Sequence, residues 1–205
     1  IRDSFVCNGS LSPAPGGPST LDTTYNPDVL YRNNGNATFN DVSSTMGVDN
    51  SLRGRGSITF DYDNDGDMDL LVVIQDNFPG YTTPTPPRVV LYRNEASSNN
   101  KWLKVKLTGT STNRDGIGVH VRAVVDGRSI MREIDGGSSH ESQNSTIAHF
   151  GLGQNNVIDT VEVTWLGGQK QVMTNVLANQ TLEVIEGATI PVCSRPNGLS
   201  ISSAT

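Results

Sequence analysis

Five aspartates alternate with other residues in one short segment, Asp61-Tyr62-Asp63-Asn64-Asp65-Gly66-Asp67-Met68-Asp69. Carboxylates at positions 1, 3 and 5 of a tight loop converge on one point, and the glycine at position 6 permits the chain to reverse. The carboxylate at position 9 and the main-chain carbonyl of Asp67 add further oxygens. Ca²⁺ prefers such an oxygen-rich cage, whereas Mg²⁺ ordinarily uses fewer carboxylates and more water. We therefore expect Ca²⁺ as the cofactor, with Asp61, Asp63, Asp65, Asp67 and Asp69 as its site.

The residues around this segment distinguish the predicted site from an EF-hand, in which the calcium loop joins two helices. Position 12 is Val72, where an EF-hand would need a bidentate glutamate. Both flanks are apolar and rich in β-branched residues, so the loop is expected to join two strands. The alternative is a solvated acidic turn that binds no ion. Like charges this close repel one another, which favours the presence of a cation.

Three histidines and a serine cluster raise other kinds of chemistry. His120, His140 and His149 could in principle form a zinc site, but His120 falls in an alternating strand, and structural roles are expected for all three. A Ser-His-Asp triad could be drawn from Ser138 or Ser139 with His140 and Asp135. No G-x-S-x-G nucleophile elbow accompanies these residues. We expect no catalytic residues and a protein that is not an enzyme.

A long polar loop after residue 135 is a candidate recognition surface for sugars or protein, because loops on a rigid sheet often carry function. Its candidate residues are Ser138, Ser139, His140, Glu141, Gln143 and Asn144. The alternative is that these side chains only satisfy backbone groups of the turn.

The second half of the chain reads as one strand after another. Apolar and polar residues alternate in each segment, which is typical of half-buried strands. Hairpin turns are expected at Asp126-Gly127 and Gly167-Gly168. Six strands are expected, over residues 102–107, 119–124, 129–134, 160–165, 170–173 and 180–185. They predict a small antiparallel sandwich or barrel.

The first half predicts hairpins and contains an internal repeat. Val29-Leu30-Tyr31-Arg32 reads as a strand followed by a turn at Asn33-Asn34-Gly35-Asn36. The segment Val90-Leu91-Tyr92-Arg93-Asn94 repeats Val29-Leu30-Tyr31-Arg32-Asn33 almost residue for residue. A repeat of this length suggests sheet units or propeller blades that stack on each other.

Composition limits the partners. The net charge of −6 disfavours nucleic acid, whose binding depends on Lys and Arg. No apolar run is long enough to span a bilayer.

The only cysteines, Cys7 and Cys193, lie near opposite ends of the chain and are expected to form a disulfide, which requires an oxidising compartment. Two free buried thiols are the alternative.

Two parts of the chain resemble known families. Leu30 to Gly35, Ala37-Thr38-Phe39 with Asp41-Val42, and Phe60 through Val72 resemble an FG-GAP/VCBS repeat. That family typically forms propeller blades with calcium-binding hairpin loops, and the resemblance implies Asp61, Asp63, Asp65, Asp69 and the carbonyl of Asp67 as ligands. Residues from about Trp102 to Glu186 resemble an ASPIC/UnbV domain. The matching segments are Asn113 to Gly118, Arg132 to Gly137, Ser142 to Ser145, His149 to Gly153 and Val161 to Trp165.

These observations predict an all-β protein in which a propeller-blade-like repeat unit packs with a small antiparallel β-sandwich or barrel. The expected boundaries are an N-terminal coil or linker at 1–28, the calcium-binding repeat at 29–95, the ASPIC/UnbV-like domain at 96–187 and a linker or further β domain at 188–205. The expected function is secreted or cell-surface adhesion, or the binding of an extracellular protein or glycan. The alternatives are a structural subunit that self-assembles through sheet edges or terminal segments, and part of a carbohydrate-active enzyme.

Overall fold

The computed structural model describes residues 3–8, 27–50, 54–74, 88–95 and 99–188. The chain divides into two compact units. The first contains Ile1–Phe60, Asp69–Asn94 and Ser139–Ser142, and the second contains Asp61–Met68, Glu95–Ser138 and Gln143–Thr205. The acidic loop therefore belongs to the second unit, although the strands on either side of it belong to the first.

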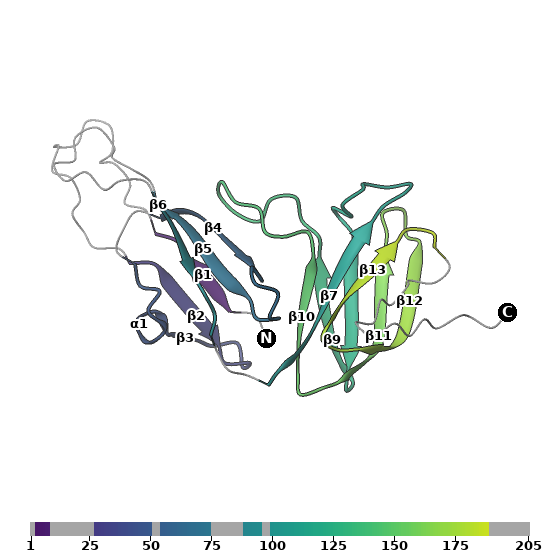
Figure 1. Cartoon of the computed structure of the whole chain (residues 1–205), viewed down its shortest axis with the longest axis horizontal. Coiled ribbons are helices and arrows are strands. Elements are labelled where there is room, and N and C mark those ends of the chain that lie inside the picture. Colours follow the sequence, from purple (N-terminus) through teal and green to yellow (C-terminus); the bar gives the residue numbers. More distant parts are fainter. Residues whose placement is uncertain (1–2, 9–26, 51–53, 75–87, 96–98, 189–205) are drawn as a thin grey trace. The chain divides into compact units, whose positions relative to one another are not determined.

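The first unit contains two antiparallel sheets of three strands (Figure 1). One has the order β1-β2-β3, with β1 at Ser4–Val6, β2 at Val29–Asn33 and β3 at Phe39–Asp41. The other has the order β4-β5-β6, with β4 at Gly54–Phe60, β5 at Asp69–Ile74 and β6 at Arg88–Tyr92. The short helix α1, Ser43–Met46, follows β3.

The hairpins expected in this unit are confirmed. The backbone N–H of Asn34 donates to the carbonyl of Thr38 at 3.0 Å, and Gly35 takes the φ of 80° that its turn requires. β4 and β5 pair in antiparallel register from Phe60 opposite Asp69 back to Gly54 opposite Ile74. The acidic loop thus connects two strands, as its apolar flanks predicted.

The N-terminal segment differs from the prediction. Residues 1–28 were expected to be coil or linker, but Ser4–Val6 forms β1 and pairs with β2 from Ser4 opposite Tyr31 to Val6 opposite Val29. Three residues are too short to show the alternation by which strands are recognised, and the proline-rich sequence after them favoured coil. The rest of the predicted linker, residues 9–26, lies outside the described residues.

The second unit is a two-sheet sandwich (Figure 1). One sheet has the order β10-β7-β13 and the other β12-β11-β8-β9. The strands are β7 Lys101–Thr108, β8 His120–Val125, β9 Arg128–Glu133, β10 Ala148–Gly153, β11 Val157–Thr164, β12 Lys170–Leu177 and β13 Gln180–Ile185. β10 was not among the six strands predicted. β13 runs parallel to β7, so the predicted antiparallel sandwich contains one parallel pair: the chain leaves one sheet after β12 and enters the other beside β7.

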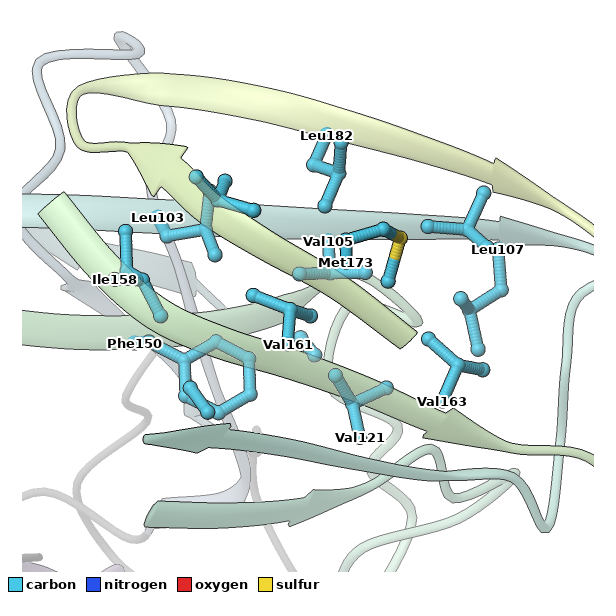
Figure 2. Packing of buried hydrophobic residues seen from close by; sticks show 14 of the residues in the cluster. Leu103, Val105, Leu107, Val121, Phe150, Ile158, Val161, Val163, Met173 and Leu182 are labelled. Carbon is cyan, nitrogen blue, oxygen red and sulfur yellow. The ribbon is translucent and has the colours of Figure 1, made fainter. Parts of the chain in front are cut away.

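Alternating apolar residues from both sheets form one core (Figure 2). Phe150, Leu103 and Leu182 come from one sheet, and Val121 and Val161 face them from the other. Burial of such a side chain stabilises the fold by roughly 1.5–3 kcal/mol. The all-β prediction is therefore confirmed. Of the described helices, none has the length and hydropathy needed to cross a membrane.

Candidate metal centre

Three of the predicted ligands converge in the loop between β4 and β5. Asp61, Asp63 and Asp65 each offer one carboxylate oxygen, and these oxygens lie within 4.8 Å of one another. Asp63 and Asp65 are exposed, whereas the side chain of Asp61 is only 2% exposed. The alternate spacing in sequence thus produces one cluster of oxygens, as position-1, -3 and -5 ligands of a tight loop require.

The loop backbone is folded by its own carboxylates. The N–H of Gly66 donates to Asp61 Oδ2 at 2.9 Å, and the N–H of Asp67 donates to Asp65 Oδ1 at 2.9 Å. Asn64 and Gly66 have positive φ values of 62° and 98°. Asparagine and glycine tolerate this conformation better than most residues, so the local sequence matches the tight reversal.

The carboxylate of Asp61 is incompletely satisfied. Its Oδ2 accepts the hydrogen bond from Gly66 and lies 2.5 Å from Lys104 Nζ. Its Oδ1 is buried and has no hydrogen-bond partner among the described residues. A buried oxygen without a partner costs about 1–3 kcal/mol, and more when it is charged. A hard cation that binds this oxygen together with those of Asp63 and Asp65 would remove the cost, so the residues fit a calcium ion.

Two strands of the second unit hold the loop. Lys104 of β7 donates to Asn64 Oδ1 at 3.2 Å in addition to its ion pair with Asp61. Its ammonium also lies 5.1 Å from the centre of the Trp102 ring. His149 of β10 lies with Nε2 at 2.8 Å from the carbonyl oxygen of Gly66. Because a carbonyl only accepts hydrogen bonds, Nε2 must carry the proton.

The pKa of His149 is lowered, chiefly because burial disfavours the charged imidazolium and, to a smaller extent, because Lys104 and Arg132 are nearby. The hydrogen bond to Gly66 opposes this shift. A neutral imidazole that donates to the loop agrees with the structural role that the sequence favoured for this histidine.

Asp67 and Asp69 have different positions. Asp67 was expected to bind through its carbonyl, and its N–H is used within the loop. Asp69 is the first residue of β5; it is buried, and its Oδ1 accepts the backbone N–H of Asn94 at 2.8 Å. Neither carboxylate belongs to the cluster formed by the other three. Their participation in an ion site stays a prediction.

The structure distributes the predicted recognition loop between the two units. In the first, Ser139 and His140 line a cavity of about 340 Å³ with Phe5, Cys7 and Arg55 among its other walls. In the second, the N–H of Asn144 donates to Ser138 Oγ at 3.3 Å, and this hydroxyl donates to Asp135 Oδ1 at 2.7 Å. Glu141 and Gln143 are exposed. Part of the loop therefore satisfies its own turn, and part lines a cavity.

The zinc site considered for the three histidines finds no support among the described residues. His120 lies 3.7 Å from Glu133, His140 lies 3.8 Å from Glu141, and His149 contacts Gly66, so the three histidines have separate partners. Among the described residues, the only group of acidic, cysteine or histidine side chains with metal-site spacing is the aspartate cluster.

The predicted disulfide has no support in the structure. Cys7 is a free thiol, and Cys193 lies outside the described residues. Burial and the nearby charge of Asp28 raise the pKa of Cys7 to about 11, so its thiol is protonated at neutral pH.

Lys104 was missed at the sequence level. It occupies a polar position in the alternation of β7, which predicts exposure, yet its side chain is only 8% exposed. The acidic loop that covers it lies 40 residues earlier in the chain. Trp102, two residues away on the same face of the strand, was the one local signal that this face is covered.

The comparisons with known proteins agree with both sequence resemblances. Residues 19–72 match the family model "FG-GAP-like repeat", and residues 109–191 match the model "ASPIC and UnbV". The chain joins an FG-GAP-like repeat to an ASPIC and UnbV domain. Within this architecture, the acidic loop lies in the matched repeat, while Lys104 lies just before the matched domain and His149 lies inside it.

Three relatives share the name cartilage acidic protein 1. The human protein (Homo sapiens) is 31% identical over 159 residues, which cover 77% of this chain and 22% of the relative. The mouse protein (Mus musculus) is 30% identical over 159 residues, covering 77% and 23%. The protein of Xenopus tropicalis is 31% identical over 118 residues, covering 57% and 17%. The match thus spans about a fifth of the length of these relatives.

Proposed function

We propose that this chain is a secreted, calcium-binding β module that serves extracellular adhesion or the binding of a protein or glycan, without catalysis. The observation that carries the proposal is the cluster of Asp61, Asp63 and Asp65, in which the buried Oδ1 of Asp61 has no hydrogen-bond partner among the described residues. A simple turn does not account for a buried carboxylate with one unpaired oxygen, because buried polar groups in proteins are almost always hydrogen-bonded.

The role of the ion is structural. Asp61, Asp63 and Asp65 would hold it, and Gly66 and Asn64 give the loop the backbone conformation that brings these carboxylates together. The ion supplies positive charge that offsets their mutual repulsion. Because it binds the folded loop, it stabilises the native state by about 2.7 kcal/mol when its concentration is a hundred times the dissociation constant.

The extracellular assignment and the partners rest on other observations. The relatives are named for cartilage and for acidity, and this chain has a net charge of −6. Calcium sites of extracellular modules bind with dissociation constants of about 10⁻⁴–10⁻³ M. The cavity lined by Ser139, His140 and Arg55 is the candidate contact for a protein or glycan ligand.

Calcium titration tests the proposal. Isothermal calorimetry and thermal melting of the full chain should show calcium binding and a rise in the melting temperature that a chelator reverses. Asp63→Asn should weaken calcium binding at least tenfold, because it removes one charged ligand. Asp115→Asn is the matched control: it removes the same charge from an exposed position outside the loop. Absence of both binding heat and thermal stabilisation in the wild-type chain would exclude the proposed role.

One observation favours the second candidate, a structural subunit. On the outer face of sheet β4-β5-β6, Val73, Val89 and Leu91 are 42%, 60% and 43% exposed, while the neighbouring Val72 and Ile74 are buried. A sheet that is apolar on both faces is suited to packing against another sheet. Light scattering across a concentration series, with Val89→Lys as the variant, distinguishes a self-assembling subunit from a monomeric binding module.

A further inference from the structure

We propose that Lys104 is an internal counter-cation that shares the Asp61 carboxylate with bound calcium, and that it thereby weakens calcium binding while keeping the loop folded without the ion. This inference rests on the proposed function, because it concerns how the same site is regulated. It assigns a role to a residue that contributes no oxygen ligand.

The two oxygens of Asp61 have different environments, and this difference makes sharing feasible. Oδ2 accepts the N–H of Gly66 and the ammonium of Lys104, whereas Oδ1 has no hydrogen-bond partner among the described residues. The carboxylate can therefore keep Lys104 on one oxygen and offer the other to an ion. Lys104 does not need to leave when the ion binds.

Burial makes the charge of Lys104 effective. The side chains of Lys104 and Asp61 are 8% and 2% exposed, so solvent screens their charges less than those of a surface pair. In the calcium-free chain, the ammonium offsets part of the repulsion among the loop carboxylates. In the calcium-bound chain, the ammonium and the ion are like charges on one carboxylate. Coulomb repulsion at a separation of a few ångströms, even at high effective dielectric constant, corresponds to roughly tenfold in affinity.

The position of Lys104 connects the loop to the sandwich at a defined point. Lys104 of β7 and His149 of β10 are directly paired across their antiparallel ladder. Lys104 contacts Asp61 and Asn64, and His149 contacts Gly66. These contacts to the loop thus come from one pair of neighbouring residues. Ion binding should therefore change the amide hydrogen-exchange rates of this pair more than those of the rest of the sheet.

Two substitutions of Lys104 separate its charge from its packing. Lys104→Met keeps the length and apolar stem of the side chain but removes the charge. Lys104→Gln also removes the charge yet retains an N–H donor for Asp61, which keeps the test informative should the methionine variant fail to fold. The matched control is Lys106→Met, which removes the same charge from the same strand at an exposed residue paired with Glu183.

The experiment measures calcium affinity by calorimetry, and melting temperature with and without calcium, for the wild type and the three variants. We expect Lys104→Met and Lys104→Gln to bind calcium roughly tenfold more tightly than the wild type and to melt at a lower temperature without calcium. The deficit in melting temperature should narrow as calcium saturates the site. Lys106→Met should bind calcium within twofold of the wild type.

The outcomes separate this inference from the proposed function. If the wild type binds calcium and both Lys104 variants bind it equally or more weakly, Lys104 does not oppose the ion and the inference is wrong, while the proposed function stands. If only the Lys104 variants bind calcium, the ammonium excludes the ion from the natural chain, so the proposed calcium role and the sharing of Asp61 between Lys104 and the ion are both wrong. If neither the wild type nor any variant binds calcium, the proposed function and the inference about Lys104 are both wrong.

Discussion

Asp61 and Glu186 are two nearly buried carboxylates of the second unit with opposite surroundings. Glu186 Oε2 accepts the backbone N–H groups of Thr110, Ser111 and Thr112 at 2.8, 2.8 and 2.9 Å. Asp61 has one oxygen with two donors and one with none among the described residues. Backbone N–H groups satisfy the hydrogen-bonding capacity of the Glu186 carboxylate. Among the described residues, the Asp61 carboxylate lacks such donors at Oδ1, so this oxygen can bind an external cation.

The pKa values of Glu186 and of a third buried carboxylate, Asp28, show the same principle. Burial alone would raise the pKa of Glu186, but its hydrogen bonds from the 110–112 backbone outweigh burial and lower it. In the first unit, Asp28 accepts one N–H, from Asn8, and its Oδ2 has no hydrogen-bond partner among the described residues. Burial raises the pKa of Asp28 to about 6, despite the hydrogen bond from Asn8. The number of donors, rather than burial alone, therefore separates these carboxylates.

The largest effect is expected for Gly66→Ala. Gly66 has φ of 98°, and an added Cβ would lie 1.9 Å from Trp102 Nε1. Backbone strain and overpacking each cost about 1–3 kcal/mol, so we expect a loss of roughly 4 kcal/mol in the free energy of unfolding. Urea denaturation measures this loss, and calorimetry should show weaker calcium binding in the same variant.

Gly137→Ala is the control for this substitution. Gly137 does not have a positive φ, and an added Cβ would meet no atom within 4 Å. Its stability should stay within about 0.5 kcal/mol of the wild type. Equal losses in the two variants would mean that contact between the loop and Trp102 does not hold Gly66 in place.

The next effect concerns Asp28 and depends on pH. Its pKa rises from 3.8 in the unfolded reference to about 6 in the folded chain, so the native state binds the proton more tightly. Stability is therefore lost as pH rises from about 4 through 6. The shift corresponds to at most about 3 kcal/mol. Asp28→Asn keeps an oxygen for the Asn8 N–H but cannot ionise, so it should gain stability relative to the wild type over this range.

Urea denaturation of the wild type and Asp28→Asn at pH 4, 5, 6 and 7 measures the effect. The difference between the two profiles cancels the contributions of the other titrating groups. Parallel profiles would show that Asp28 keeps an ordinary pKa in the folded protein, and hence that missing donors do not distinguish it from Glu186.

Glu186→Gln should have a smaller effect, because glutamine keeps an acceptor oxygen for the 110–112 backbone. The folded pKa of Glu186 is lowered from the unfolded reference of 4.5, so its charge contributes stability that is present above that value and is lost as pH falls through the folded pKa. The variant should be less stable than the wild type at pH 7, and the difference should shrink below pH 4. A difference that grows on acidification would contradict the assignment.

Much of the fold follows from local sequence. Alternation located β7, β8, β9, β11, β12 and β13, and the Asp126-Gly127 and Gly167-Gly168 turns lie between the strands they were expected to join. Positive φ values of 49° and 70° at Asp126 and Gly127 explain why that dipeptide marks the hairpin. β10 was not counted as a strand because Gly151 and Gly153 interrupt its apolar pattern, although Phe150 and Leu152 are buried.

The site was predictable only where its residues are close in sequence. The spacing of Asp61, Asp63 and Asp65 indicated their convergence directly. Contacts made across the chain left no such signal: Lys104 reaches Asn64 over 40 residues, and Glu186 reaches Thr110 over 76. Lys104 lies within an alternating strand and Glu186 just after the end of one, and alternation alone predicts that both are solvated. Tertiary packing buries them instead.

The smallest effect is expected for the exposed ion pair on the same strand as Lys104. Lys106 Nζ lies 3.0 Å from Glu183 Oε1, and both side chains are more than half exposed. Solvent and salt screen such a pair, so a double-mutant cycle with Lys106→Met and Glu183→Gln should give a coupling energy below about 0.5 kcal/mol. The cycle with Lys104→Met and Asp61→Asn in calcium-free buffer should give a clearly larger coupling, because breaking a buried pair leaves an uncompensated charge. Comparable coupling energies from the two cycles would mean that Lys104 is solvated in the folded chain. The contrast between Glu186, which backbone N–H groups satisfy, and Asp61, which depends on a cation, would then lose its main support.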